Sequence, residues 1–163
     1  MLSAALFCLV VAISDGDTLK VRCGEPGDFR QLTIRLHAVD APELNQPFGR
    51  RAKQALSQVA YRKIARLYCE HDEDRYQRRV CRVQVAPDDC TEARCATTRD
   101  VGLAMLSAGL AWWARAYANE QGPIERGRYG LAEFEAKAKG AGLWADRRPV
   151  PPWRWRAEHP RPR

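Results

Sequence analysis

An apolar run precedes an acidic turn near the start of the chain, and a stretch of alternating hydrophobic and polar residues follows it. Residues 8–23, CLVVAISDGDTLKVRC, therefore predict a β-hairpin. Asp15 and Gly16 suit the centre of a two-residue type I′ turn, in which both residues have positive φ. That centre sets Cys8 opposite Cys23, whereas a shift of one residue would turn one cysteine to the other face.

The alternation resumes between Phe29 and Val39 and predicts a third strand. Arg35 lies on the face opposite to the apolar residues Leu32, Ile34, Leu36 and Ala38. Apolar residues at helical spacing follow Pro47 and predict a helix that ends at about Ile64. Residues 65–85 then indicate two further strands joined by a charged loop.

Helical patterns dominate the later part of the chain. Thr98 is the predicted N-cap of a short helix that ends near Gly109. A last helix is expected from Pro123 to Lys139, with its inward face formed by Leu131, Phe134 and Ala138. Strands followed by helices predict an α+β protein that is mainly β, a small barrel with helical caps.

Composition divides the chain into a body and a tail. We expect one domain at residues 8–145, because 163 residues suffice for one hydrophobic core. Residues 146–163 contain five prolines and six arginines and predict no regular structure. This tail carries a net charge of +4 out of the total of +7, so the charge of the body alone is a weak indication of a polyanionic partner. The Arg and Trp side chains of the tail suit contact with nucleic acid, packing against the barrel or docking to a protein.

Six cysteines are many for a protein of this length, and their number is even. The gaps of eleven and four residues among the last four cysteines fit paired C-x2-C zinc ligands poorly, so disulfides are favoured over zinc. We predict the pairs Cys69–Cys81, Cys90–Cys95 and Cys8–Cys23, in that order of preference. Disulfides indicate an extracytoplasmic protein, periplasmic or secreted.

The apolar N-terminus is interpreted as a first strand. It lacks the basic region of a signal peptide, and it is too short to span a bilayer. No membrane span is therefore predicted.

Four acidic residues occupy two short turns of this basic chain: Asp15, Asp17, Asp40 and Glu43. Carboxylates would repel a polyanion at a contact surface. Their presence suggests that a metal ion lies between them and the partner. Their hard oxygen atoms suit Ca²⁺.

Five short motifs, in order along the chain, resemble those of the staphylococcal nuclease (thermonuclease) family. They are DGDT at 15–18, RLHAVDAPE at 35–43, DRYQR at 74–78, GLA at 109–111 and GLW at 142–144. The resemblance implies a five-stranded OB-fold barrel with three helices. It also implies a calcium-dependent nuclease of low sequence specificity that hydrolyses phosphodiester bonds in DNA, RNA or both.

The resemblance implies a metal site and a catalytic group. Asp17, Asp40 and the backbone carbonyl of Ala41 would bind Ca²⁺, and Asp15 would support them. Glu43 would act as the general base that activates or orients water.

The resemblance also implies the groups that bind substrate. Arg35 and Arg78 would clamp the phosphate, because planar guanidinium groups bind oxygen atoms in pairs. Arg75 and Tyr76 would contact a terminal phosphate, and Tyr117 would stack on a base.

Two departures from the family pattern bear on efficiency. Gln77 stands where relatives usually have glycine, which would strain a backbone with positive φ. Arg115 stands about where many relatives carry an aromatic residue.

The alternative function is a non-catalytic OB-fold module that binds single-stranded nucleic acid, but such a module gains nothing from carboxylates that face the phosphate. A monomer is expected.

Overall fold

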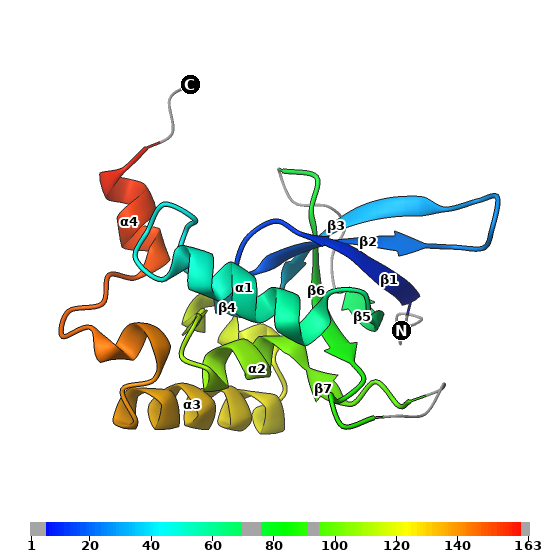
Figure 1. The fold of residues 1–163 in the computed structure, drawn as a ribbon. Helices are drawn as coiled ribbons and strands as arrows, with labels where there is room; N and C mark the ends of the chain where they lie inside the picture. Colours follow the sequence, from blue (N-terminus) through cyan, green and yellow to red (C-terminus); the bar gives the residue numbers. More distant parts are fainter. Residues whose placement is uncertain (1–5, 70–75, 91–94, 161–163) are drawn as a thin grey trace.

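A computed structural model describes residues 6–69, 76–90 and 95–160. Five strands form a closed barrel: β1 (Leu6–Ile13), β2 (Thr18–Cys23), β3 (Arg30–Leu36), β5 (Ile64–Cys69) and β6 (Arg79–Val85). The strands β1, β2 and β3 form an antiparallel meander, and β5 joins β1 to β6. Parallel pairing of β3 with β6 closes the barrel. The predicted five-stranded OB-fold is confirmed (Figure 1).

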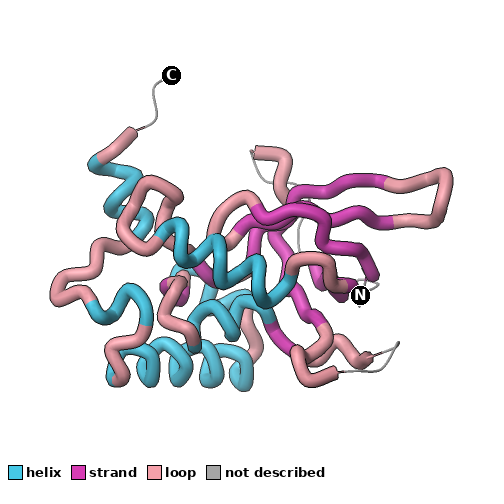
Figure 2. Tube along the Cα trace, in the orientation of Figure 1, coloured by secondary structure: helices cyan, strands magenta, loops and turns pink. Residues whose placement is uncertain are grey.

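Helices cover one end and one side of the barrel (Figure 2). The three main helices are α1 (Gly49–Ala60), α2 (Val101–Ser107) and α3 (Pro123–Ala138). Two short 3₁₀ segments, η1 (Arg115–Glu120) and η2 (Gly142–Ala145), flank α3. Short strands complete the fold: β7 (Arg99–Asp100) pairs with the end of β6, and β4 (Val39–Asp40) pairs with β8 (Trp112–Trp113).

The core lies inside the barrel and beneath α1 and α2. Alternate residues of the strands point inward and are almost fully buried, including Val10, Leu19, Val21, Ile34, Leu36, Leu67 and Val83. Leu56 of α1 and Met105 of α2 close the end of the barrel. Arg35 lies on the opposite side of β3 from Ile34 and Leu36, as the alternation predicts.

The hairpin register is confirmed at its open end but not at its turn. Cys8 pairs with Cys23, but a bulge between Val10 and Ala12 shifts the later pairs. Ser14 N therefore donates to Thr18 O, and neither Asp15 nor Gly16 has positive φ. The predicted type I′ turn is wrong, because the bulge shifts the register by one residue and four residues, 14–17, lie between the strands.

Two predictions about the helices are also wrong. The N-cap of α2 is Asp100, not Thr98, and its carboxylate accepts from Leu103 N at 2.9 Å. The face of α3 that contains Leu131 and Phe134 is exposed, and the buried face contains Tyr129, Ala132, Glu133 and Ala136. Polar partners explain this orientation, because Tyr129 donates to Asp100 at 2.9 Å and Glu133 accepts from three donors.

The tail forms a helix where the sequence predicted no regular structure. Helix α4 (Pro152–Glu158) begins at a proline, which suits the first turn of a helix. Pro152 is buried, and Trp153 lies edge-on to Trp112 at 5.5 Å between ring centroids. The tail therefore packs against the body, next to the loop that precedes α1 (Figure 1). No helix in the described ranges has the length and apolar character needed to cross a membrane.

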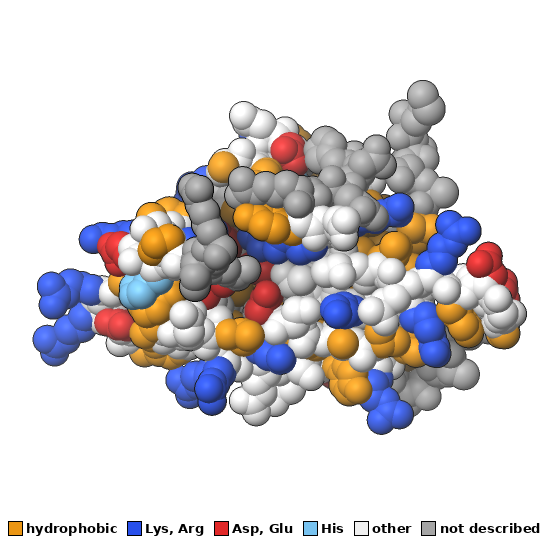
Figure 3. Space-filling model, turned by 90° about the horizontal axis from the view of Figure 1, so that it is seen from above, with side chains coloured by type: hydrophobic (Ala, Val, Ile, Leu, Met, Phe, Trp, Pro, Cys, Tyr) orange, Lys and Arg blue, Asp and Glu red, His pale blue; other side chains and the backbone are white. Residues whose placement is uncertain are grey.

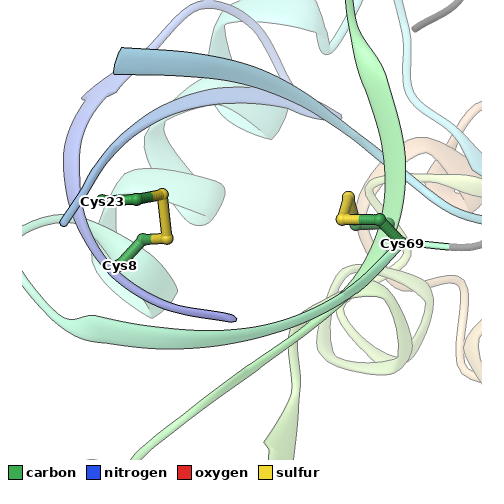
Figure 4. Close-up of a disulfide and its surroundings, with 4 residues drawn as sticks. Cys8, Cys23 and Cys69 are labelled. Carbon is green, nitrogen blue, oxygen red and sulfur yellow. A yellow bond between two sulfur atoms is a disulfide. The ribbon is translucent and has the colours of Figure 1, made fainter. Parts of the chain in front are cut away.

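The six cysteines form the three predicted pairs. The Cα atoms are 4.4 Å apart in Cys8–Cys23, 4.1 Å in Cys69–Cys81 and 6.2 Å in Cys90–Cys95. Each separation is short enough for a disulfide. The first two pairs cross-link neighbouring strands on opposite sides of the barrel (Figure 4).

Removing the Cys69–Cys81 disulfide is expected to lower the free energy of unfolding by about 2.5–3 kcal/mol, because the bond restricts the unfolded chain. Urea unfolding of the Cys69→Ala/Cys81→Ala variant measures the loss. The Cys90→Ala/Cys95→Ala variant is the matched control and should lose less, since its loop spans fewer residues. An equal or larger loss in the control would contradict the loop-length argument.

Candidate active site

Two glycines allow the acidic turns to meet at one end of the barrel. A Cβ atom on Gly16 would lie 2.7 Å from the Cβ of Ala41 and 2.6 Å from that of Ala52. A Cβ atom on Gly49 would lie 1.8 Å from the carbonyl oxygen of Glu43. Only glycine permits these approaches, which bring the turn after β1, the turn after β4 and the start of α1 together.

Asp17 and Asp40 are joined by Arg35. Arg35 Nη1 donates to Asp17 Oδ1 at 2.8 Å, and Nη2 donates to Asp40 Oδ1 at 3.2 Å. Ala41 N donates to Asp17 Oδ2 at 2.8 Å, which fixes the turn after β4 against the turn after β1. Asp15 supports this arrangement, because its Oδ1 accepts from Asp17 N at 3.0 Å.

Burial makes the ionised form of Asp17 costly. Burial raises the pKa of Asp17 to about 7, and Asp15 and Asp40 add to this rise although Arg35 opposes it. Burial alone would lower the pKa of Arg35, but the charges of Asp17 and Asp40 raise it. Asp17 therefore lies in surroundings that favour additional positive charge.

Glu43 lies on a compact turn beside these carboxylates. Glu43 N donates to Gln46 Oε1 at 3.1 Å, and Gln46 N donates to Glu43 O at 2.8 Å. Gln46 is buried, and its side chain also donates to Val150 O at 2.6 Å. The turn that carries Glu43 is thus fixed both by its own hydrogen bonds and by the tail.

Arg156 of α4 contacts the acidic site from the tail. Its Nη2 donates to Asp40 Oδ2 at 2.7 Å, and its Nη1 donates to Asp40 Oδ1 at 3.1 Å and to Glu43 Oε1 at 2.9 Å. Hydrogen bonds to these carboxylates raise the pKa of Arg156 above its usual value. Three carboxylates, Asp17, Asp40 and Glu43, therefore face two guanidinium groups.

A groove of about 1240 Å³ runs beside this cluster. Arg35, Glu43 and Arg156 line it, and so do Tyr76, Arg78 and Tyr117. Arg78 lies over the ring of Tyr76, with its Cζ 5.0 Å from the ring centroid. On the face seen in Figure 3, basic side chains are distributed over the surface and acidic ones form smaller, separate patches.

The two departures from the family pattern have different structural consequences. Gln77 has a φ of 58°, so its backbone adopts the left-handed conformation that only glycine adopts without strain. Arg115 does not line the groove. It extends toward α3, where it donates to Glu133 Oε2 at 2.8 Å and lies over Trp113. Glu133 also accepts from Trp113 N and Lys137, and this pairing accounts for its burial.

Most of the site residues predicted from sequence are brought together. Asp15, Asp17, Arg35, Asp40 and Ala41 form one hydrogen-bonded cluster, next to Glu43. The groove contains the other described candidates, Tyr76, Arg78 and Tyr117. Arg75 lies outside the described residues.

Three residues of the tail that reach the site were not predicted from the sequence: Trp155, Arg156 and His159. Trp155 and His159 are stacked, with ring centroids 3.9 Å apart, and both line the groove. The repeated Trp-Arg pairs of PPWRWR were the only signal, and they did not show which part of the body the tail contacts.

The carboxylates fit a hard divalent cation. Asp17 and Asp40 supply oxygen ligands within reach of one arginine, and the carbonyl of Ala41 follows directly in the chain. Within the described part of the chain, no group of three or more acidic, histidine or cysteine side chains is gathered closely enough to hold an ion. A site built here would therefore use two carboxylates, a backbone carbonyl and water.

The barrel and this groove define an OB-fold protein with a mixed site of carboxylates and arginines. The family described as "Staphylococcal nuclease homologue" matches residues 33–146. The chain belongs to the staphylococcal nuclease family.

Three relatives illustrate this membership. An "Uncharacterized endonuclease" of Haemophilus influenzae is 38% identical, over 93% of this chain and 73% of its own length. "Protein ParB" of Escherichia coli is 40% identical, over 91% and 78%. A "Micrococcal nuclease" of Shigella flexneri is 34% identical, over 90% and 78%.

Proposed function

We propose that this protein is a calcium-dependent nuclease that hydrolyses phosphodiester bonds in DNA, RNA or both with low sequence specificity. The observation that carries the proposal is the cluster in which Arg35 joins Asp17 to Asp40 beside Glu43, along a groove that contains Arg78. Family membership supports the nuclease class.

Each group has a role that follows from its chemistry. Asp17, Asp40 and the carbonyl of Ala41 hold Ca²⁺, which when bound supplies positive charge at the phosphate. Arg35 and Arg78 bind phosphate oxygen atoms and stabilise the negative charge that develops as water attacks. Glu43 takes the proton of the attacking water or orients it.

The remaining groups bind and position the substrate. Tyr76 and Tyr117 are both exposed in the groove and offer ring faces to the sugar or base. Asp15 holds the backbone of Asp17 and acts on the metal site indirectly. Arg75 is proposed to bind substrate on the grounds of sequence alone.

The proposal extends to the setting in which the protein works. Three cysteine pairs favour an oxidising compartment, so we infer an extracytoplasmic nuclease. We propose residues 8–145 as the nuclease domain, acting as a monomer, and residues 146–163 as an appended tail.

Hydrolysis of single-stranded DNA and RNA by the purified protein tests the function. Activity is expected at roughly millimolar Ca²⁺, because few carboxylates and an open groove favour weak metal affinity. Excess chelator should abolish it, and added Ca²⁺ should restore it. Full activity in chelator would contradict the metal assignment, and binding of nucleic acid without hydrolysis at any Ca²⁺ concentration would indicate the non-catalytic OB-fold module instead.

A further inference from the structure

We propose that α4 is an autoinhibitory latch: Arg156 occupies the carboxylates of the metal site, and Ca²⁺ binds only when Arg156 withdraws. The inference rests on the proposed function and concerns the regulation of the same site. It assigns to the tail a role in controlling metal loading.

The contacts of Arg156 use the oxygen atoms that a metal ion would need. Both carboxylate oxygens of Asp40 accept from Arg156, and Oδ1 also accepts from Arg35. The Asp40 side chain is only 8% exposed, so little of it remains open to another ligand. A guanidinium group and a divalent cation cannot both occupy the same face of one small carboxylate.

The docking of the tail explains why Arg156 lies at this site. Trp153 packs against Trp112, which pairs directly with Asp40 in the two-stranded sheet of β4 and β8. The hydrogen bond from Gln46 to Val150 ties the start of the tail to the turn that carries Glu43. These two anchors place the end of α4 over the acidic cluster.

The contacts of α4 allow Arg156 to leave the carboxylates. A helix of seven residues is not stable alone in water, so α4 depends on its contacts with the body. The Arg156 side chain is 42% exposed, whereas the anchor at Pro152 is buried. Arg156 also competes with Arg35 for Asp40 Oδ1, and the two positive charges repel each other. Release of Arg156 therefore exposes no apolar core.

Release of Arg156 would affect the groove as well as the metal site. Trp155 and His159, on either side of Arg156 in the chain, line the groove together with Tyr117 and Arg78. Withdrawal of the end of α4 together with Arg156 would clear these side chains from the path of the substrate. By linkage, whatever favours the open position of α4 also favours metal binding, and the reverse holds equally.

Calcium affinity of the full chain tests the latch. We expect Arg156→Gln to bind Ca²⁺ about tenfold more tightly than the wild type in calorimetric titration, since charge-assisted hydrogen bonds no longer compete. Arg154→Gln is the matched control, because it removes the same charge from the same helix at a side chain whose ion pair is with Glu158 rather than with the acidic site. It should bind Ca²⁺ as the wild type does.

A third variant separates the contact from the charge. Arg156→Lys keeps the charge but cannot donate to both oxygens of Asp40 in parallel, so an affinity between those of the wild type and Arg156→Gln is expected. A wild-type affinity in Arg156→Lys would show that charge alone is responsible and would overturn the latch. Equal affinities in the wild type and Arg156→Gln would overturn it too.

Hydrogen exchange of α4 provides a measurement that does not depend on activity. Added Ca²⁺ should speed amide exchange in residues 152–158 of the wild type, whereas Arg156→Gln should exchange rapidly at any Ca²⁺ concentration. Unchanged protection of the wild type when Ca²⁺ binds would overturn the latch and leave the proposed function intact. If neither the wild type nor Arg156→Gln binds Ca²⁺, the metal assignment fails and the latch fails with it.

Discussion

Substituting Glu43→Gln is expected to lower the rate of phosphodiester hydrolysis by a factor of about 10²–10⁴, the usual contribution of general acid–base catalysis. Glutamine cannot accept the proton of the attacking water. The fold should survive, because the turn is held by the backbone of Glu43 and the side chain of Gln46. Glutamine also retains an oxygen atom that can accept from Arg156.

Single-turnover rates at saturating Ca²⁺ measure this effect, with Ca²⁺ affinity determined separately by titration. Glu25→Gln, in the exposed turn between β2 and β3, is the control and should keep the wild-type rate. An unchanged rate in Glu43→Gln would remove Glu43 from the mechanism.

Substituting Arg78→Lys is expected to lower the turnover rate by about 10²–10³, the effect of removing one preorganised donor to a developing negative charge. Lysine keeps the positive charge, but it cannot bind two phosphate oxygens with a planar group. The side chain lies in the groove over Tyr76, so its loss should change the reaction more than the stability.

Steady-state kinetics with single-stranded DNA test this prediction. A fall in kcat with little change in KM is expected if Arg78 acts chiefly in the transition state. Arg79→Lys is the neighbouring control, since Arg79 does not line the groove and should tolerate lysine. Equal rates in both variants would contradict a clamp at Arg78.

The barrel was predictable because its signals are local. Alternation in β2 and β3 gives the inward faces directly, and the pairing of Cys8 with Cys23 follows from a register centred on the turn. The bulge between Val10 and Ala12 was not predictable, because it interrupts a run of apolar residues whose side chains give no alternation to break. The turn type failed for the same reason.

Long-range partners explain the other failures. The buried face of α3 contains Tyr129 and Glu133. These polar side chains can be buried only because Tyr129 pairs with Asp100, and Glu133 pairs with Arg115 and neighbouring groups. Sequence pattern ranks residues by their own hydrophobicity and cannot show these partners.

In the candidate site, too, residues in local motifs could be predicted and a long-range partner could not. Asp17, Arg35, Asp40 and Glu43 lie in two short motifs that the sequence analysis identified. Arg156 reaches Asp40 across 116 positions of the chain, from a segment whose prolines and charges are typical of an unstructured tail.

The closure of the barrel has a consequence for heat sensitivity. Arg35 belongs to β3 and Arg78 directly precedes β6, so the distance between these two proposed phosphate ligands is set by the one parallel seam of the barrel. Only three residue pairs form that seam, Ile34 with Arg79, Arg35 with Val80 and Leu36 with Cys81. Fraying of the seam would spread the two guanidinium groups while the antiparallel meander remained folded. Warming should therefore reduce catalysis before it unfolds the core, because the distance between Arg35 and Arg78 depends on the shortest strand pairing of the barrel.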